Sequence, residues 1–319
     1  MKNSLIYYSV GALLYCPANN ETIANSLIAE RFGTQYSLAL CLEDTIGDNH
    51  VDEAELKLIS SLNTILHARL SKTFYIPKIF IRVRNPEQIV RLYNKSGKAA
   101  ELVTGFIIPK FCIENAGLYI EAIENVNKIS PKTIYMMPIF ESPTIINLKH
   151  RYDILYTLKE KLDSIEPYVL NIRVGGNDLC HTFGFRRHSN ESIHDIKPVS
   201  SIFSDIITVY GMDYIVSGPV WEYYNGDNWD TGLKQEIKQD RLCGFIGKTV
   251  IHPKQIDIVN SEYAVSCSDL EDAKNILNWD TSSPSFVSGN SSKERMNEFK
   301  THCNWAKTIM FLSQFYGTK

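Results

Sequence analysis

Short apolar runs alternate along the chain with longer segments whose apolar residues recur every three to four positions. Runs of this kind, ended by polar residues, are typical of buried strands, and the segments between them of amphipathic helices. The predicted strands span residues 11–16, 36–42, 76–83, 105–108, 132–140, 168–174, 213–217 and 247–251. The predicted helices span residues 21–32, 52–70, 86–96, 116–129, 149–165, 199–210 and 231–242. Strands that alternate with helices of this length form parallel βαβ units.

The number of strands and the chain length narrow the fold class. No Gly-x-Gly-x-x-Gly string follows the first predicted strand, so eight strands favour a closed (β/α)8 TIM barrel over an open dinucleotide-binding sheet. The 319 residues allow one barrel of about 250 residues or two domains. We predict an α/β fold in which residues 1–260 form the barrel. Residues 261–319 form a C-terminal helical extension, with helical composition at 270–277 and 293–316 and a loop at 281–292.

Composition and charge exclude several classes of protein. Hydrophobic residues make up 44% and charged residues 22%, as in a globular protein, and the net charge of −3 favours neither nucleic acid nor an anionic membrane as a partner. No run approaches the roughly 18 apolar residues that would span a bilayer. Seven cysteines without a C-x-x-C pair suggest a reducing, cytoplasmic location. The first residues loosely resemble a signal peptide ending at Cys16, but Tyr7 and Tyr8 interrupt it, so we expect a first core strand.

The residues that end the strands carry most of the candidate chemistry. Parallel barrel strands all point the same way, so their carboxyl ends meet at one mouth, where barrel active sites are built. Any strand must end in polar or turn residues, and that simpler interpretation stays open for each position taken alone. Charged residues at several successive ends favour a site. The strand ends are Pro17 and Asn19, Glu43 and Asp44, Arg84, Lys110, Glu141, Asn177 and Asp178, Pro219, and His252.

Two carboxylates are candidate metal ligands. Glu141 follows the fifth strand in MMPIFES and Asp178 follows the sixth in VGGNDL, so they belong to neighbouring strand ends. Two oxygen ligands with open positions suit Mg2+, which keeps several water or substrate oxygens. The alternative is structural: Asp178 caps the next helix and Glu141 accepts a backbone N–H.

Two arginines in IFIRVRN are candidate anion ligands. Arg82 and Arg84 lie two residues apart, so on one strand they point to the same side. An inward arginine needs an anion, which Glu43, Asp44 or a substrate carboxylate could supply. The alternative is a solvated strand end. His252 has no second metal ligand near it, and Gly176 could allow either anion binding or close packing.

Together these strings resemble the citrate lyase β-subunit-like group of the HpcH/HpaI aldolase superfamily, most closely its C–C bond lyase branch associated with tellurite-resistance gene clusters. The strings are LLYCPANN, LALCLEDTIG, IRVRN, GFIIPK, PIFES, GGNDL and GFIGKTVIHPKQI, in chain order. One departure is Cys41, where the group has an acidic residue two positions before Glu43.

The resemblance implies a TIM barrel that binds Mg2+ through Glu141 and Asp178, with Arg82 contacting a substrate carboxylate or carbonyl. It implies C–C bond cleavage or formation through an enolate, on a small oxo or hydroxy acid or its acyl thioester. Relatives form trimers or hexamers, so a homo-oligomer is expected. The general base is open between Glu43, Asp44 and an acidic residue of the extension.

Two other functions remain as alternatives to the lyase. The first is an acyl thioester hydrolase that uses the same residues. The second is a non-catalytic, metal-binding assembly protein, against which the presence of Glu141, Asp178 and Arg82 argues.

Overall fold

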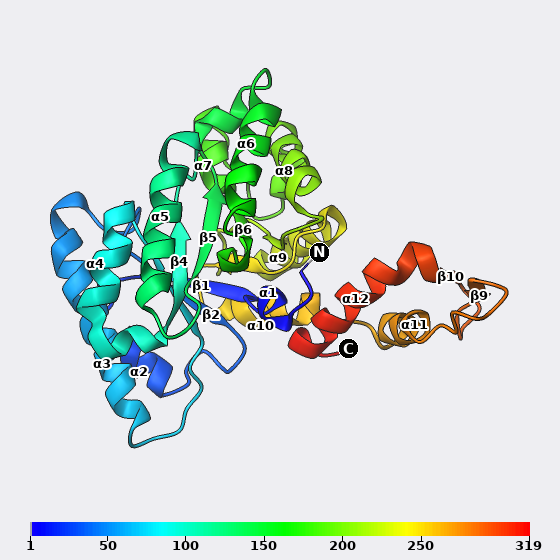
Figure 1. The fold of residues 1–319 in the computed structure, drawn as a ribbon, viewed down its shortest axis with the longest axis horizontal. Coiled ribbons are helices and arrows are strands. Elements are labelled where there is room, and N and C mark those ends of the chain that lie inside the picture. Colours follow the sequence, from blue (N-terminus) through cyan, green and yellow to red (C-terminus); the bar gives the residue numbers. More distant parts are fainter. Residues whose placement is uncertain (1) are drawn as a thin grey trace.

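The computed structural model describes residues 2–319 and contains one eight-stranded parallel sheet. The strands follow each other around the barrel in chain order, and the first pairs with the last (Figure 1). This confirms the predicted fold class. The strands are β1 (Ala12–Pro17), β2 (Ser37–Cys41), β3 (Lys78–Arg82), β4 (Val103–Ile108), β5 (Tyr135–Phe140), β6 (Ile172–Val174), β7 (Val216–Ser217) and β8 (Lys248–Val250).

Helices surround this sheet and bury their apolar sides against it (Figure 1). In α4, for example, Asn85 accepts the N–H of Gln88 at 3.0 Å, Pro86 opens the helix, and Ile89 and Leu92 are buried one turn apart. The helices of this layer are α2 (Ile23–Ile28), α3 (Val51–Arg69), α4 (Pro86–Ser96), α5 (Ile113–Ile129), α6 (Arg151–Asp163), α7 (Gly176–Phe183), α8 (Lys197–Tyr210), α9 (Trp229–Cys243) and α10 (Lys254–Tyr263).

The barrel interior is apolar toward the amino ends of its strands and polar toward their carboxyl ends. Inward positions of β1 to β5, such as Leu13 and Phe80, form a cluster separate from the core beneath the helices. The short helix α1 (Leu5–Tyr8) packs Ile6 and Tyr7 against this cluster. Because side chains alternate along a strand, the next inward positions are Tyr15 on β1 and Arg82 on β3. The polar layer therefore lies at the carboxyl ends of the strands.

The barrel closes through a narrow seam between β7 and β8. β7 has two residues. The junction includes a bridge between Gly218 and Lys248, a hydrogen bond from the Gly218 N–H to the Gly247 carbonyl at 2.9 Å, and one from the Ile246 N–H to the Val216 carbonyl at 2.8 Å. Behind the seam, the buried Lys248 donates to Glu236 at 2.9 Å and to Asp240 at 2.6 Å, both from α9. This ion network holds α9 against the seam.

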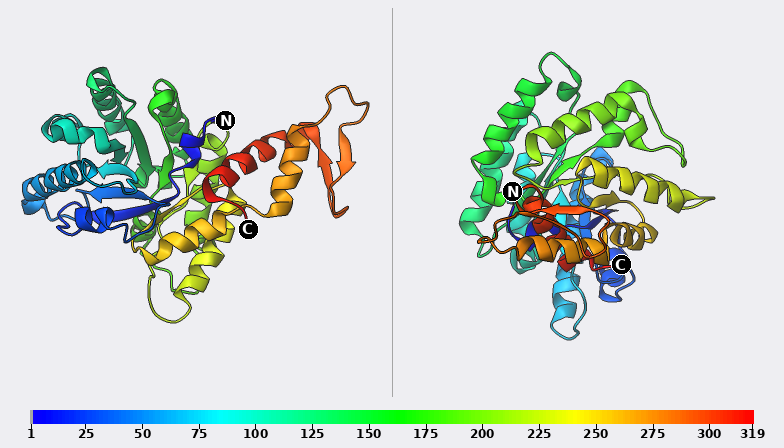
Figure 2. Two further views of the ribbon diagram at one scale, coloured as in Figure 1. Left: turned by 90° about the horizontal axis from the view of Figure 1, so that it is seen from below. Right: turned by 90° about the vertical axis from the view of Figure 1, so that its right-hand side faces the viewer.

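The C-terminal region forms an arm that projects from the barrel (Figures 1 and 2). It pairs α11 (Cys267–Leu277) with α12 (Phe299–Tyr316) around a small apolar cluster, and β9 (Val287–Gly289) and β10 (Met296–Glu298) form a hairpin at its tip. Its helical character is confirmed, but β9 replaces part of the predicted loop and β10 replaces the start of the helix predicted over 293–316, which begins at Phe299 instead. The predicted boundary at residue 260 lies within α10, and the division into barrel and extension stays a prediction.

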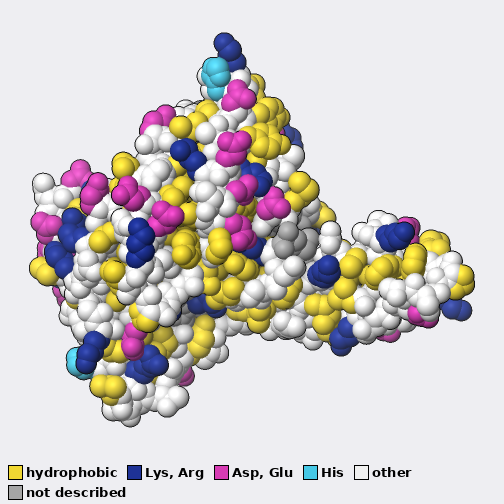
Figure 3. Space-filling model, viewed as in Figure 1, with side chains coloured by type: hydrophobic (Ala, Val, Ile, Leu, Met, Phe, Trp, Pro, Cys, Tyr) yellow, Lys and Arg dark blue, Asp and Glu magenta, His cyan; other side chains and the backbone are white. Residues whose placement is uncertain are grey.

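Apolar side chains are visible along the arm and at its junction with the barrel (Figure 3). At the junction, the ring of Phe311 stacks on Tyr8 at 4.7 Å, and that of Tyr316 stacks on Tyr263 at 5.3 Å. These contacts fix one end of α12 to the barrel. No helix of residues 2–319 is long and apolar enough to cross a membrane.

Candidate active site

An ion cluster occupies the mouth of the barrel at the ends of β2, β3 and β5. The guanidinium of Arg82 lies 2.7 Å from Glu43, 3.0 Å from Asp44 and 3.2 Å from Glu141. The Nζ atom of Lys110 lies 2.6 Å from Glu43 and 3.2 Å from Asp44. The strand ends thus bring together side chains up to about one hundred residues apart in sequence, as parallel barrel strands require.

Glu141 is the most enclosed carboxylate of this cluster, with 3% of its surface exposed. Its Oε1 atom accepts the backbone N–H of Lys110 at 3.0 Å, and Lys110 holds a left-handed backbone (φ 47°) that non-glycine residues seldom adopt. Gly175 lies against the other side: a Cβ there would stand 2.1 Å from Oε2 of Glu141. Only glycine therefore lets the end of β6 approach this carboxylate.

The three carboxylates of the cluster differ in the direction of their pKa shifts. Burial raises the pKa of Glu141 to about 8; Arg82 opposes this shift and the charge of Asp178 adds to it. Burial and the interaction with Asp44 also raise the pKa of Glu43. Burial opposes ionisation of Asp44 as well, but Glu43, Arg82 and Lys110 outweigh it and lower its pKa. Asp44 is therefore the member that stays ionised most readily.

A cavity of about 440 Å3 opens beside the cluster. Of the predicted site residues, it is lined by Asp44, Arg82, Glu141, Gly176, Asn177 and Asp178. Gly176 to Asp178 form the first turn of α7, a helix that the sequence analysis did not predict because its Gly-Gly-Asn-Asp start is typical of a loop. The turn carries Asp178 to the cavity next to Glu141.

The other predicted site residues do not line this cavity. Arg84 follows the end of β3, where strand alternation no longer applies, and its guanidinium binds the carbonyls of Leu42 and Ile46 and the carboxylate of Asp48. It therefore orders the loop after β2. The remaining residues outside the lining are Pro17, Asn19, Glu43, Lys110, Pro219 and His252.

Two of these contact the ion cluster and one packs elsewhere. Glu43 and Lys110 belong to the cluster around Arg82. The His252 ring stacks on Tyr224 with centroids 4.6 Å apart, and its Nδ1 accepts the N–H of Lys254. The structure supports the structural interpretation of this histidine.

The family model described as the C–C bond lyase of the TIM-barrel fold matches residues 4–318. The chain belongs to this family. This confirms the resemblance drawn from the strand-end strings.

Solved structures share the fold of this chain at low sequence identity. A citrate lyase from Burkholderia xenovorans is 14% identical with a TM-score of 0.73, covering 97% of this chain and 93% of that one. CitE from Mycobacterium tuberculosis, solved with magnesium, acetoacetate and coenzyme A, is 16% identical with a TM-score of 0.61, over 97% and 99% of the two chains. RipC from Yersinia pestis is 16% identical with a TM-score of 0.56, over 83% and 99%.

Curated relatives match this chain over a short segment. A (3S)-malyl-CoA thioesterase from Cereibacter sphaeroides is 42% identical over 48 residues, which is 15% of this chain. The chain thus spans 17% of the length of the curated relatives that it matches.

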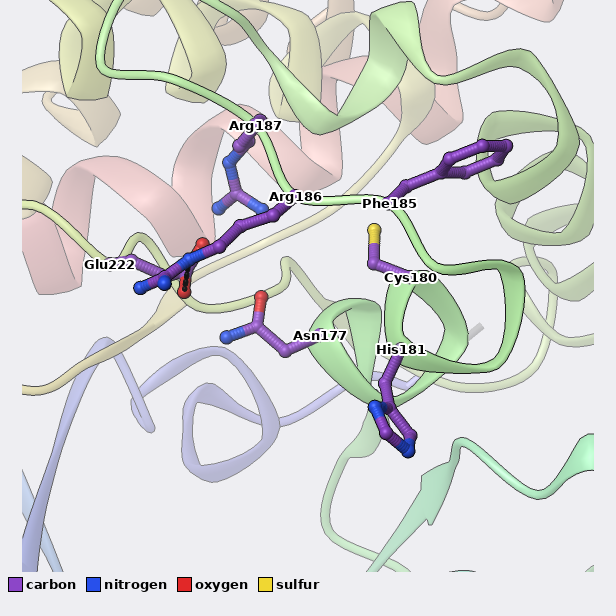
Figure 4. A pocket seen from close by; sticks show the side chains of 7 residues that line it. All are labelled: Asn177, Cys180, His181, Phe185, Arg186, Arg187 and Glu222. Carbon is purple, nitrogen blue, oxygen red and sulfur yellow. Dashed lines mark ion pairs between the residues drawn. The ribbon is translucent and has the colours of Figure 1, made fainter.

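Beside the mouth, the structure has a second recess of about 210 Å3 that shares part of its lining with the cavity. Figure 4 shows the side chain of Asn177 directed toward the ion pair of Arg186 and Glu222, whose atoms lie 3.5 Å apart, while His181 and Phe185 point away. Asn177, Arg186 and Glu222 border both spaces. They form a polar rim through which a longer ligand could leave the barrel.

Among the cavity residues that the sequence analysis did not predict, three polar ones belong to strands: Tyr15 on β1, Arg173 on β6 and Thr249 on β8. Each lies inside a strand rather than at its end, so a search of strand ends misses it. For Arg173 a signal exists, since a charged residue in the apolar run of NIRVGG is unusual for a buried strand.

Proposed function

We propose that this protein is a Mg2+-dependent carbon–carbon lyase that acts beside the carbonyl of a small oxo or hydroxy acid, or its acyl thioester, through an enolate. The observation that carries the proposal is the pair Glu141 and Asp178 at the cavity wall, with Arg82 beside them. A buried carboxylate whose pKa is raised by burial and by a second carboxylate is a site that a divalent cation would stabilise.

The donor set fits Mg2+ better than a transition metal. Two carboxylates leave several coordination positions for water and substrate oxygens, which is the usual arrangement for this ion. Within residues 2–319 there is no group of three or more His, Cys, Asp or Glu side chains suited to a metal ion. The ion would be held by Glu141 and Asp178, and would supply Lewis-acid polarisation of the substrate carbonyl.

The remaining residues of the mouth have separate roles in this proposal. Arg82 brings positive charge to the oxygen on which negative charge develops, and its buried Nε has no hydrogen-bond partner within the described chain. Of the carboxylates that are not proposed metal ligands, Asp44 borders the cavity, so its position suits it to accept a proton from the substrate. Glu43 and Lys110 orient Arg82 and Asp44.

Calorimetric titration of Mg2+ tests the metal site independently of turnover. We expect Glu141→Gln and Asp178→Asn each to weaken Mg2+ binding about tenfold or more, which corresponds to about 1.4 kcal/mol. Glu101→Gln serves as the control, because its exposed carboxylate pairs with Arg69 far from the mouth. Unchanged affinity in both site variants would remove the ligand assignment.

Thioester hydrolysis is the second candidate function, supported by the 48-residue match to a (3S)-malyl-CoA thioesterase. Incubation with malyl-CoA separates the two reactions by their products. Release of glyoxylate with acetyl-CoA supports cleavage of the C–C bond, whereas malate with free CoA supports hydrolysis. Binding of Mg2+ and thioester without either product would support the non-catalytic, metal-binding assembly protein instead.

The cellular location and the oligomeric state are also part of the proposal. A cytoplasmic location is supported by the seven cysteines, all free in the described structure. A homo-oligomer, trimer or hexamer, is supported by the arm, which carries exposed apolar residues such as Val287 and Met296 away from the barrel.

A further inference from the structure

The barrel interior holds a second arginine below the ion cluster. Arg173 on β6 is 2% exposed and lines the cavity floor with Tyr15 and Thr249. It pairs in register with Ile139, two residues below Glu141 on β5. Its guanidinium donates to Thr249 Oγ1 at 2.5 Å and to Asn171 Oδ1 at 3.4 Å. Both acceptors are neutral.

No carboxylate pairs with Arg173 anywhere in residues 2–319. The other buried arginines differ: Arg82 contacts three carboxylates, Arg151 contacts Asp205 at 2.8 Å and Arg187 contacts Glu236 at 3.2 Å. Burial lowers the pKa of Arg173, in keeping with a cation that lacks a counter-charge. A buried charge without a partner is strongly unfavourable, so such a group in a cavity is suited to an anionic ligand.

The ion cluster above cannot provide a site for a second anion. It combines two cations, Arg82 and Lys110, with three carboxylates, Glu43, Asp44 and Glu141, and a fourth carboxylate, Asp178, acts on Glu141. With the proposed Mg2+ ion bound, the charges of this cluster only balance, so no positive charge is left for a second carboxylate. Arg173 instead interacts with the neutral Tyr15, whose ring lies 5.9 Å from the Arg82 guanidinium.

We infer that Arg173 is a specificity-determining residue that binds a second, remote carboxylate of the substrate, so that the substrate is a dicarboxylic oxo or hydroxy acid. This rests on the proposed function. The reacting end of such a substrate lies at Glu141 and Asp178, and its far carboxylate lies one layer deeper, against the planar fork of the guanidinium. Thr249 and Tyr15 place two hydroxyl groups beside it. A thioester group would leave through the polar rim instead.

Succinate and butyrate provide a matched pair of probes, because they have the same carbon skeleton and differ by one carboxylate. Binding is measured by calorimetry on the full chain in the presence of Mg2+, so that one carboxylate of either probe can bind at the proposed metal site. We expect the wild type to bind succinate about tenfold or more tightly than butyrate, the usual effect of a charge-assisted hydrogen bond. We expect Arg173→Gln to bind the two equally and Arg173→Lys to keep part of the preference. Arg151→Gln, a buried arginine outside the cavity, should keep all of it.

Thermal melting separates ligand binding from a structural role. Without ligand, Arg173→Gln should melt no lower than the wild type, because it removes an uncompensated charge, whereas Arg151→Gln breaks an ion pair and should melt lower. Succinate should raise the melting temperature of the wild type and not that of Arg173→Gln.

Two results would overturn the inference: a wild type that does not prefer succinate, or an Arg173→Gln variant that still does. The wild-type measurement needs no variant to fold. Neither result depends on turnover, so loss of the proposed lyase activity with an intact succinate preference would contradict the function and leave the carboxylate site standing.

Discussion

At the scale of single residues, the site depends on close approach as much as on charge. Gly175 is in contact with the carboxylate of Glu141, and no side chain fits between them. The Lys110 amide reaches the same carboxylate only because its backbone takes a left-handed conformation. Both features fix where Glu141 lies, and so where a cation would be bound.

Gly175→Ala tests this close approach. The added Cβ would overlap Oε2 of Glu141, so the carboxylate must move, and we expect Mg2+ affinity to fall about tenfold or more. Gly117→Ala is the matched control, because a Cβ at this position in α5 meets no atom within 4 Å; it should leave Mg2+ binding unchanged and stabilise the helix by about 0.5–1 kcal/mol. Calorimetry and urea unfolding measure the two effects. Equal Mg2+ affinity in both variants would contradict the role of Gly175.

The sequence predicted the residues that act at strand ends and missed those inside strands. Arg82, Glu141 and Asp178 were found because the carboxyl ends of parallel strands converge. Arg84 was expected to share the direction of Arg82, but β3 ends at Arg82 and the rule of alternation ends with it. Tyr15 and Arg173 occupy inward positions within apolar runs, where register alone decides which face they line, and register is a property of the folded sheet.

At the scale of elements, an ion network behind the β7–β8 seam joins Lys248 of β8 to α9. Lys248, Glu236 and Asp240 are all inaccessible to solvent, and His194 adds a contact of 2.7 Å to Asp240. A Cβ at Gly218 would meet Asp240 at 2.8 Å, so the seam and α9 are closely packed.

Lys248→Met tests the network. The substitution removes the cation that Glu236 and Asp240 share and leaves only Arg187 beside Glu236 and His194 beside Asp240, so we expect the free energy of unfolding to fall by about 3–5 kcal/mol. Lys234→Met on α9 removes an exposed pair with Asp230 and should cost about 0.5 kcal/mol or less. Urea denaturation measures both values. A Lys248→Met protein as stable as Lys234→Met would show that the network contributes nothing.

The elements themselves were predicted where periodicity was regular. The bounds of α4 were predicted exactly as residues 86–96 because its cap, its proline and its apolar spacing agree. In contrast, α7 begins with residues typical of loops, and the β9–β10 hairpin has only three residues in each strand, all but one of them exposed. Such short exposed strands leave no pattern of alternation to detect.

The arm has its own pH-sensitive contact. Asp272 on α11 is buried and lies 2.6 Å from Nε of Arg295, beside β10. Burial opposes its ionisation, but hydrogen bonds from Arg295, Asn297 and Asn290 outweigh it and lower the pKa of Asp272 below its ordinary 3.8. The ionised form is therefore favoured in the folded state, and its stabilising effect is present above pH 3.8 and is lost as pH falls through the lowered pKa.

Comparison of the wild type with Asp272→Asn measures this effect. We expect the variant to melt at a lower temperature near neutral pH, and the difference to shrink as pH falls below about 4. A difference that stays constant through this range would show that the charge of Asp272 does not act on stability.

At the scale of the whole molecule, the arm extends the surface of the barrel without lining its cavity. The proposed oligomer predicts that apolar residues of the hairpin are covered by a neighbouring copy. We expect Val287→Ser combined with Met296→Ser to reduce the fraction of trimer or hexamer seen by mass photometry. The control is Leu70→Ser with Leu148→Ser, which changes two leucines on the barrel that are even more exposed than Val287 and Met296. A monomeric wild type would contradict the proposal.

The pairing of β1 with β8, which lies next to the narrow seam between β7 and β8, also bears on how the barrel folds. β1 and β8 lie at opposite ends of the barrel sequence, and residues 12–14 pair with residues 248–250. Pairing between strands that are neighbours in sequence closes short loops. The pairing of β1 with β8 closes a loop of more than two hundred residues and costs more conformational entropy, so we expect it to form late. The curved sheet of β1 to β7 would thus assemble first as an open intermediate, and β8 would complete it. Formation of the cavity would then be the final folding event, because Tyr15 and Thr249 come from the two strands that meet last.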